Sequence, residues 1–388
     1  MRLLDGVLRR GLPLDAAPMG EAGEARDRAL AHVITAEALR RLPDLDALID
    51  GATKQRLADD AKARFALRIA LVQALVLGTP PHAAISTVLP LVDGGPRRLV
   101  HGVFSAVMRA NPALPDPPTL PEAVAKRWRA AWGADVVSAA ARMIAAPPLL
   151  DLGFPVDAAA PDIEGTSLMP GHLRVSRGTA VTELPGYAEG KWWVQDIAAS
   201  MPARQLGAGE GRQVLDLCAA PGGKTIQLAA AGWTVTALDI SESRLARLSE
   251  NLARTGLSAE LVAADVMDWA PPGPVDSVLL DAPCSATGTF RRHPDVIHRV
   301  RPKAIAELAD MQKAMLDRAA GWVKPGGTLV YAVCSLEREE GEAVSKAFAA
   351  KHPDFAFEEK QRLLPGLHEE QGGADSFYIA RFTRLNRG

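Results

Sequence analysis

Between residues 24 and 110, apolar residues recur at the three- and four-residue spacing of an amphipathic helix. In EARDRALAHVITAEALRRL, for example, Leu30, Val33 and Ile34 stand among charged residues. The segment AKARFALRIALVQALVLG is richer in apolar residues and ends at Gly78, shortly before two prolines, which is a helix stop signal. Because no alternation typical of strands interrupts this part of the sequence, we predict an all-α bundle.

The helical pattern breaks at NPALPDPPTLP, a proline-rich stretch that predicts a linker. Two more helical segments, PEAVAKRWRAAWG and DVVSAAARMIAA, follow it. The pattern is then weak as far as residue 190, with a few short strands expected. We therefore predict a helical domain over 1–112, a linker and small connecting subdomain over 113–205, and a third domain over 206–388.

The third domain alternates short β-rich apolar runs with helical stretches. The runs are QVLDLC, TVTALD, ELVAAD, SVLLD and GTLVYAV, and helices such as SESRLARLSENLART separate most of them. This alternation is typical of βαβ units and predicts a Rossmann-like α/β fold with a mostly parallel sheet. FAFEE and SFYIARF near the end predict an antiparallel hairpin at one edge.

Composition narrows the class of protein. The chain has 388 residues, a net charge of −2 and three cysteines. It contains no run of the roughly 18 apolar residues that a membrane helix needs, and its N-terminus has no secretory h-region. Three cysteines form neither a disulfide set nor a metal-site pairing, so we expect a cytoplasmic protein without a metal. A nucleic-acid site must be a local basic patch.

A glycine-rich turn joins the first strand of the third domain to a helix in LDLCAAPGGKT. A P-loop would need glycine where Cys218 stands, and a dinucleotide fingerprint needs more glycines than Gly222 and Gly223. The turn instead predicts a place where a ligand approaches the backbone. Acids follow the next three strands as Asp239, Asp265 and Asp281.

Each of these acids taken alone could simply cap the following helix. Three in succession after a glycine turn favour a nucleoside ligand without a phosphate chain, with Asp239 on the ribose and Asp265 on the adenine side. S-adenosylmethionine fits this description.

All three cysteines end strands, at the edge where open α/β sheets bind ligands. Small buried hydrophobes are the alternative, which we favour for Cys218. Cys284 and Cys334 follow the fourth and fifth strands. Two thiols beside a methyl donor suggest methylation of cytosine C5, which becomes nucleophilic once a thiolate adds to C6. Asp281 is placed to hydrogen-bond the N3/N4 edge of the base.

The motifs VLDLCAAPGGKT, ALDIS, DAPCSATGTFRRHPD and YAVCSLEREEGE resemble the Sun-type RNA (cytosine-5) methyltransferases. The N-terminal helices are similar to the NusB-like domain of the bacterial 16S ribosomal RNA methyltransferase B group. The resemblance implies that Cys334 is the nucleophile, that Cys284 assists release, and that small-subunit ribosomal RNA is the substrate. It also implies a donor site that comprises Cys218, Ala219, Ala220, Pro221, Gly222, Gly223, Lys224, Asp239, Asp265 and Asp281.

Three positions depart from the family pattern. Val333 stands where threonine is usual, Ala286 where glycine is commoner, and LLDLGF replaces an Arg-Val-Asn-like signature.

A basic stretch after Cys284 predicts RNA contacts, with a solvated helix face as the alternative. Its members are Arg291, Arg292, His293, Arg299, Arg301 and Lys303. The target base must leave its stack to meet a buried thiol. We expect a monomer with an RNA partner and no membrane.

Three alternative functions stay open at this point. A tRNA cytosine-5 methyltransferase would use the same chemistry on another RNA. A DNA cytosine-5 methyltransferase would attack with Cys284 instead. A NusB-like assembly factor would not catalyse at all.

Overall fold

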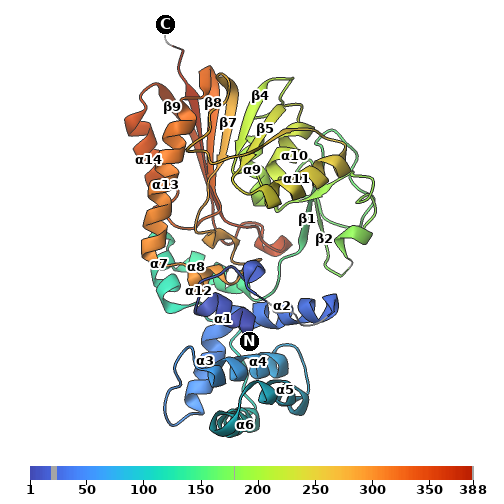
Figure 1. The fold of residues 1–388 in the computed structure, drawn as a ribbon, viewed down its shortest axis with the longest axis vertical. Coiled ribbons are helices and arrows are strands. Elements are labelled where there is room, and N and C mark those ends of the chain that lie inside the picture. Colours follow the sequence, from blue (N-terminus) through green and yellow to red (C-terminus); the bar gives the residue numbers. More distant parts are fainter. Residues whose placement is uncertain (19–23, 179, 387–388) are drawn as a thin grey trace. The chain divides into compact units, whose positions relative to one another are not determined.

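The computed structural model describes residues 1–18, 24–178 and 180–386 (Figure 1). The chain forms two compact units. The first comprises Met1–Pro147 and Thr289–Val300, and the second comprises Pro148–Gly288 and Arg301–Gly388. These units do not coincide with the three parts expected from the sequence. Arg41 Nη1, for example, donates to the carbonyl of Pro115 at 2.5 Å, across the predicted boundary at residue 112.

The first unit is built from helices, as the sequence predicted. Their bounds are α1 Arg2–Leu8, α2 Ala25–Arg40, α3 Leu42–Gly51, α4 Lys62–Leu75, α5 Pro81–Val88, α6 Gly94–Arg109, α7 Glu122–Trp132, α8 Ala134–Ile144 and α12 Val296–Arg299. Helix α4 is central, since a continuous run from Ala63 to Gln73 is buried. A helix that is covered on all sides is typical of a bundle core.

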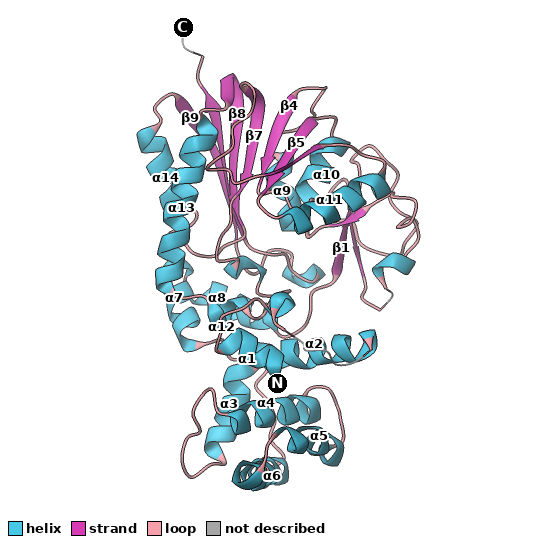
Figure 2. Cartoon of the chain, in the orientation of Figure 1, coloured by secondary structure: helices cyan, strands magenta, loops and turns pink. Residues whose placement is uncertain are grey.

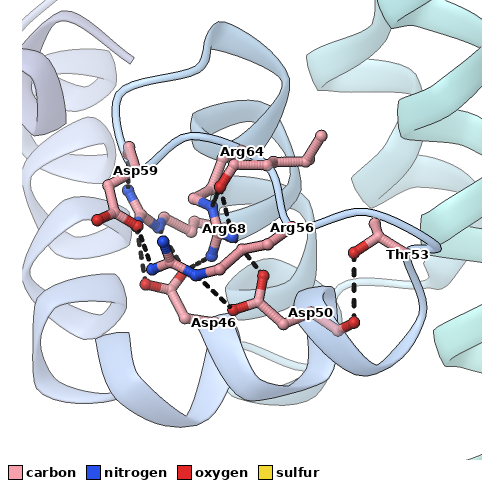
Figure 3. Close-up of polar contacts among 8 residues, drawn as sticks. Asp46, Asp50, Thr53, Arg56, Asp59, Arg64 and Arg68 are labelled. Carbon is pink, nitrogen blue, oxygen red and sulfur yellow. Dashed lines mark hydrogen bonds and ion pairs between the residues drawn. The ribbon is translucent and has the colours of Figure 1, made fainter.

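Two buried arginines of α4 join it to α3 (Figure 3). Arg64 is fully buried, and its Nη1 lies 3.0 Å from Asp46 Oδ1 while Nη2 pairs with Asp50. Arg68 donates to both oxygens of Asp46 at 2.8 Å. The exposed Arg56 contacts Asp50 at 3.3 Å from the loop between the helices. Pairing of this kind compensates for the loss of water around the buried guanidinium groups.

The segment 289–300 belongs to this helical unit, although it follows the Cys284 loop in sequence. Arg40 Nη2 donates to the carbonyl of Arg291 at 2.7 Å, and His298 Nε2 lies 2.7 Å from the carbonyl of Leu39. Burial lowers the pKa of His298 to about 4. The imidazole is therefore neutral at physiological pH and serves as a buried hydrogen-bonding group.

The second unit contains a seven-stranded sheet in the order β6-β5-β4-β7-β8-β10-β9. Figure 2 labels β5, β4, β7, β8 and β9 of this sheet. The strands are β4 Gln213–Leu217, β5 Thr234–Asp239, β6 Glu260–Ala263, β7 Val275–Asp281, β8 Val323–Val333, β9 Phe355–Leu363 and β10 Phe377–Arg384. Strands β4 to β8 pair in parallel, and β10 is antiparallel to both β8 and β9. The predicted parallel sheet with an antiparallel edge hairpin is confirmed.

Helices cover both faces of this sheet. They are α9 Ile197–Arg204, α10 Gly223–Ala230, α11 Glu242–Thr255, α13 Pro302–Ala320 and α14 Glu342–Lys351. Alternate residues of β4 point to opposite faces. Leu215 and Leu217 pack in the cluster that includes α13 and α14, whereas Val214 packs in the cluster that includes α9, α10 and α11.

A three-stranded sheet precedes the large one, with β1 Leu150–Gly153, β2 His172–Val175 and β3 Trp193–Val194. The divergent segment LLDLGF therefore supplies β1. Its Asp151 accepts two hydrogen bonds from Arg174 at 2.6 and 2.8 Å and a third from the Ile197 amide at 2.9 Å. These bonds attach the small sheet to the start of α9. Within the described residues, every helix is too short or too polar to cross a membrane.

Candidate active site

The order of the strands creates a ligand crevice beside β4. From β4 the chain proceeds to β5 and β6 on one side, and β7 and β8 lie on the other. Connections leave in opposite directions at such a switch point, so the carboxyl ends of β4 and β7 are left open. Cys218 directly follows β4, and Asp281 is the last residue of β7. The predicted site residues therefore converge on one edge of the sheet.

The loop of residues 218–222 after β4, which is the predicted donor loop, has a backbone that depends on glycine. Cys218 has a φ of 61° and Gly222 a φ of 108°, both in the left-handed region. A Cβ on Gly222 would lie 2.1 Å from Leu248 Cδ1, so any other residue would strain the backbone and displace Leu248. Helix α10 begins at the next residue.

Asp239 holds this loop in place. The carboxylate is 1% exposed and accepts the amide of Ala220 at 3.1 Å and that of Ser241 at 2.9 Å. It also pairs with Arg244 Nη2 at 2.7 Å. Asp265 is partly exposed and accepts the amide of Met267 at 2.8 Å. Both acids bond to backbone amides, but neither caps a helix: Ser241 is the N-cap of α11, and no helix is described between β6 and β7. The roles of Asp239 and Asp265 toward a donor stay predictions.

Lys224 and Asp281 form an ion pair at the mouth of the crevice, with Nζ 2.7 Å from Oδ2. Burial alone would lower the pKa of Lys224, but the Asp281 carboxylate outweighs it and the pKa is raised. The ammonium is therefore occupied by a protein carboxylate and is not directed at a phosphate chain. This charge balance fits a donor that is a nucleoside without phosphates, as S-adenosylmethionine is.

The two predicted catalytic thiols meet. Cys284 Sγ and Cys334 Sγ lie 3.5 Å apart, on loops that follow the adjacent parallel strands β7 and β8. The contact with the Cys334 thiol and then burial raise the pKa of Cys284 well above its usual value. Cys284 is accordingly a protonated thiol at neutral pH. Cys218 is also held as a thiol, because burial raises its pKa strongly.

The structure adds site residues that sequence reasoning missed. Ser285 and Ser335, which follow the two cysteines, both bond to the buried carboxylate of Glu340. The repeated Cys-Ser dipeptide was the signal that could have revealed them. Ala286, where glycine is commoner in the family, has a φ of 56°, a conformation that glycine adopts more easily.

Asp216 was missed as well, although it is a polar residue inside the apolar run of β4. It is fully buried, and its Oδ2 accepts the Thr225 hydroxyl of α10 at 2.6 Å. Its Oδ1 has no hydrogen-bond partner within the described part of the chain. Burial raises the pKa of Asp216 to about 7. The carboxyl group that supports the donor loop is therefore only partly ionised near neutrality.

The predicted RNA contacts belong to both units, since residues 291–299 lie in the first and Arg301 and Lys303 in the second. Arg291 is 2% exposed, so we withdraw it from the predicted contacts. Arg299 pairs with Asp295 at 2.9 Å, and the exposed Lys303 lies 3.7 Å from Glu307. Arg299 and Lys303 stay predictions, as do Arg292, His293 and Arg301.

Residues 203–383 match the family described as 16S rRNA methyltransferase RsmB/F, and residues 8–109 match the NusB family. The chain is 34% identical over 419 residues to ribosomal RNA small subunit methyltransferase B of Xylella fastidiosa, covering 99% of this chain and 96% of that protein. Its identity to the Klebsiella pneumoniae protein of the same name is 32% over 428 residues, covering 98% and 96%.

Solved structures support the fold. PH0851 superposes with a TM-score of 0.74 at 22% identity, covering 98% of this chain and 97% of that one. NSun6 from Pyrococcus horikoshii, solved with SFG, has a TM-score of 0.60 at 19% identity, covering 69% and 99%. With both family matches and full-length relatives in agreement, the chain belongs to the ribosomal RNA small subunit methyltransferase B family of S-adenosylmethionine-dependent RNA methyltransferases.

Proposed function

We propose that the protein methylates C5 of a cytosine in 16S ribosomal RNA, with Cys334 as the nucleophile and Cys284 as the thiol that assists release. The observation that carries this proposal is the 3.5 Å separation of the two sulfur atoms at the ends of β7 and β8. The named relatives support 16S ribosomal RNA as the substrate. The cytoplasmic location and the monomeric state stay predictions.

The proposed reaction has three steps: addition of a thiolate to C6, methyl transfer to C5, and elimination of the thiolate. The Cys334 thiolate forms a bond to C6, and the displaced electron pair makes an enamine whose C5 is nucleophilic. The methyl donor supplies an electrophilic methyl group on a positively charged sulfur. After methyl transfer to C5, a base takes the C5 proton, the C6–S bond breaks and the thiolate departs. Asp281, which is 27% exposed at its side chain, is proposed to hydrogen-bond the N3/N4 edge of the base.

The protonation state of Cys284 suits the second role better than the first. Its raised pKa disfavours the thiolate that addition requires. A neutral thiol beside the adduct can instead exchange protons during elimination. The DNA-type alternative, in which Cys284 attacks, needs this thiol to ionise within a buried contact.

Denaturing electrophoresis with labelled RNA and methyl donor separates the two mechanisms. We expect Cys334→Ala to form no adduct. Cys284→Ala should methylate the base and then stall as a covalent protein–RNA complex, because its release step fails. Cys218→Ala is the control for the third thiol and should not accumulate such a complex. A shifted band with Cys334→Ala and none with Cys284→Ala would reverse the assignment. Bisulfite sequencing of cellular RNA with and without the gene tests 16S against transfer RNA.

We also propose that the helical unit docks the RNA, and α6 offers the supporting surface. One face of α6 is buried in the bundle through Val100, Val103, Phe104 and Val107. Its other face exposes Arg97, Arg98, His101 and Arg109. The helix has no acidic residue, and among the described residues no carboxylate pairs with these four side chains. Unpaired cations along a helix favour contact with phosphates.

The double change Arg97→Gln with Arg98→Gln tests this surface. We expect KM for RNA to rise at least about fivefold while kcat is unchanged, and the slope of log KM against log salt to fall by about two, one for each lost phosphate contact. Arg9→Gln is a matched control, because Arg9 is exposed but already pairs with Asp5 at 2.9 Å. Equal KM values for the double variant and the control would exclude α6 as the dock.

A further inference from the structure

A single buried carboxylate joins the two cysteine loops. Glu340 lies between β8 and α14 and is 0% exposed. Its Oε1 accepts the amide of Ser285 at 2.8 Å, and its Oε2 accepts the hydroxyl groups of Ser285 and Ser335, each at 2.5 Å. One side chain thus contacts the residue directly after each thiol.

The α13 helix completes the shell around this group. Gln312 Nε2 donates to Glu340 Oε1 at 3.2 Å and to the carbonyl of Pro283 at 2.9 Å. The Tyr331 hydroxyl, from β8, donates to the Glu340 carbonyl at 2.5 Å. The Glu340 side chain is therefore fixed from both loops and from the helix that packs beneath them.

Burial of this carboxylate costs free energy, because the charged form loses its contact with water, and it raises the pKa of Glu340. No lysine, arginine or histidine in the described ranges pairs with it, so four hydrogen bonds alone compensate for the lost water. A charge is not needed to satisfy those donors, since an amide of the same shape could make four bonds with rotated serine hydroxyls. What the position requires is a planar group long enough to reach both loops.

We propose that Glu340 is a positioning residue that holds the Cys284 and Cys334 loops at the spacing needed to serve one pyrimidine ring. The proposal rests on the roles assigned above to the two thiols. One sulfur must reach C6 and the other must act near the adjacent C5, so a small displacement of either loop disables the pair. Other contacts also join the two loops, since Ser285 Oγ lies 3.1 Å from Ser335 Oγ and the Leu336 amide donates to Thr287 Oγ1 at 3.0 Å. Glu340 differs from them in that it binds the Ser285 amide and both serine hydroxyls.

Two variants of Glu340 test separately whether the length of its side chain or its negative charge matters. Glu340→Gln loses the charge but keeps the length, and its amide can accept from Ser285 N–H and donate to the two hydroxyls. Glu340→Asp keeps the charge but is one methylene shorter, so it cannot contact both loops at once. The proposal expects the glutamine variant to behave like the wild type and the aspartate variant to behave like Glu340→Ala.

We call Glu340 and its bonds to the two cysteine loops the Glu340 clamp. Hydrogen–deuterium exchange of the full-length protein without RNA tests this clamp independently of the methylation chemistry. We expect amides in residues 284–288 and 334–337 to exchange at least about tenfold faster in the aspartate and alanine variants. The Ser285 amide loses its bond to Glu340 directly, and the Glu337 amide bonds to the Ser335 hydroxyl that Glu340 holds. Exchange in β4 and β5 should not change. If Glu340→Ala does not fold, the aspartate and glutamine variants still decide the question.

Turnover provides the second readout. In Glu340→Asp we expect kcat to fall about tenfold to a hundredfold, a larger stalled covalent fraction on denaturing gels, and donor affinity within about twofold of wild type. A glutamine variant as defective as the aspartate variant, or unchanged exchange in both loops, would overturn the proposal. If the loops loosen but no variant forms an RNA adduct, the clamp stands as a structural element and the proposed catalytic roles of the thiols fail.

Discussion

Asp216 makes the stability of the catalytic sheet depend on pH. Its carboxyl group is fully buried in β4, with one oxygen bonded to Thr225 and the other without a partner in the described structure. Burial raises its pKa from the usual 3.8 to about 7. The native protein therefore keeps this proton over a pH range in which the unfolded chain has already lost it.

The sign and size of the effect follow from this difference. Where the unfolded state binds fewer protons than the native state, the free energy of unfolding falls as pH rises. The stabilisation is complete below about pH 4 and is lost by about pH 7. A shift of about three pH units at about 1.4 kcal/mol each corresponds to a loss of about 4 kcal/mol across that window.

The substitution Asp216→Asn isolates this contribution from that of other acids. The amide is neutral at every pH and its oxygen can still accept the Thr225 hydroxyl. We expect the unfolding free energy of the variant, relative to wild type, to rise by about 1.4 kcal/mol per pH unit between pH 4 and 7 and to level off above pH 7.

Urea unfolding at several pH values, followed by hydrogen exchange of the peptide that contains β4, measures this difference. Asp268→Asn is the control, because Asp268 is exposed and no pH-dependent difference from wild type is expected. A relative stability of Asp216→Asn that stays constant from pH 5 to pH 8 would refute the reasoning. It would mean that the buried carboxylate is ionised throughout that range.

Two further changes test other parts of the molecule. Asp265→Ala should weaken S-adenosylmethionine binding by about 1–3 kcal/mol in calorimetry, because a polar group of the bound donor loses its hydrogen-bond partner. The change Asp268→Ala, at an exposed residue, should not weaken binding, and unchanged affinity in both variants would remove Asp265 from the site. Arg64→Met should reduce the unfolding free energy of the helical unit by about 2 kcal/mol, measured by circular dichroism in urea, since the partly exposed Asp46 and Asp50 each lose one of two arginine partners. Arg56→Met, at a side chain 62% exposed, should change it by less than about 1 kcal/mol; equal effects would deny the buried network its role.

The sequence alone predicted the two kinds of architecture because they depend on local periodicity. A spacing of three to four residues indicated the helices of the first unit, and short β-rich runs separated by helical stretches indicated the parallel sheet. The location of the site followed from topology, since parallel strands end at a common edge. The sequence therefore predicted that Cys284, Cys334 and Asp281 lie close together.

Only the tertiary structure decided which of these groups touch, and what supports them. Glu340 accepts a hydrogen bond from the Ser285 amide, although the two residues are far apart in sequence and no periodic pattern connects them. Arg291 is buried, although it belongs to a basic stretch of the sequence. The segment 289–300 joins the helical unit despite its position within the second half of the chain. Side-chain periodicity reports which face of an element is covered, but a contact between distant segments depends on the packing of the whole chain, and so do the burial and the pKa of each group at the site.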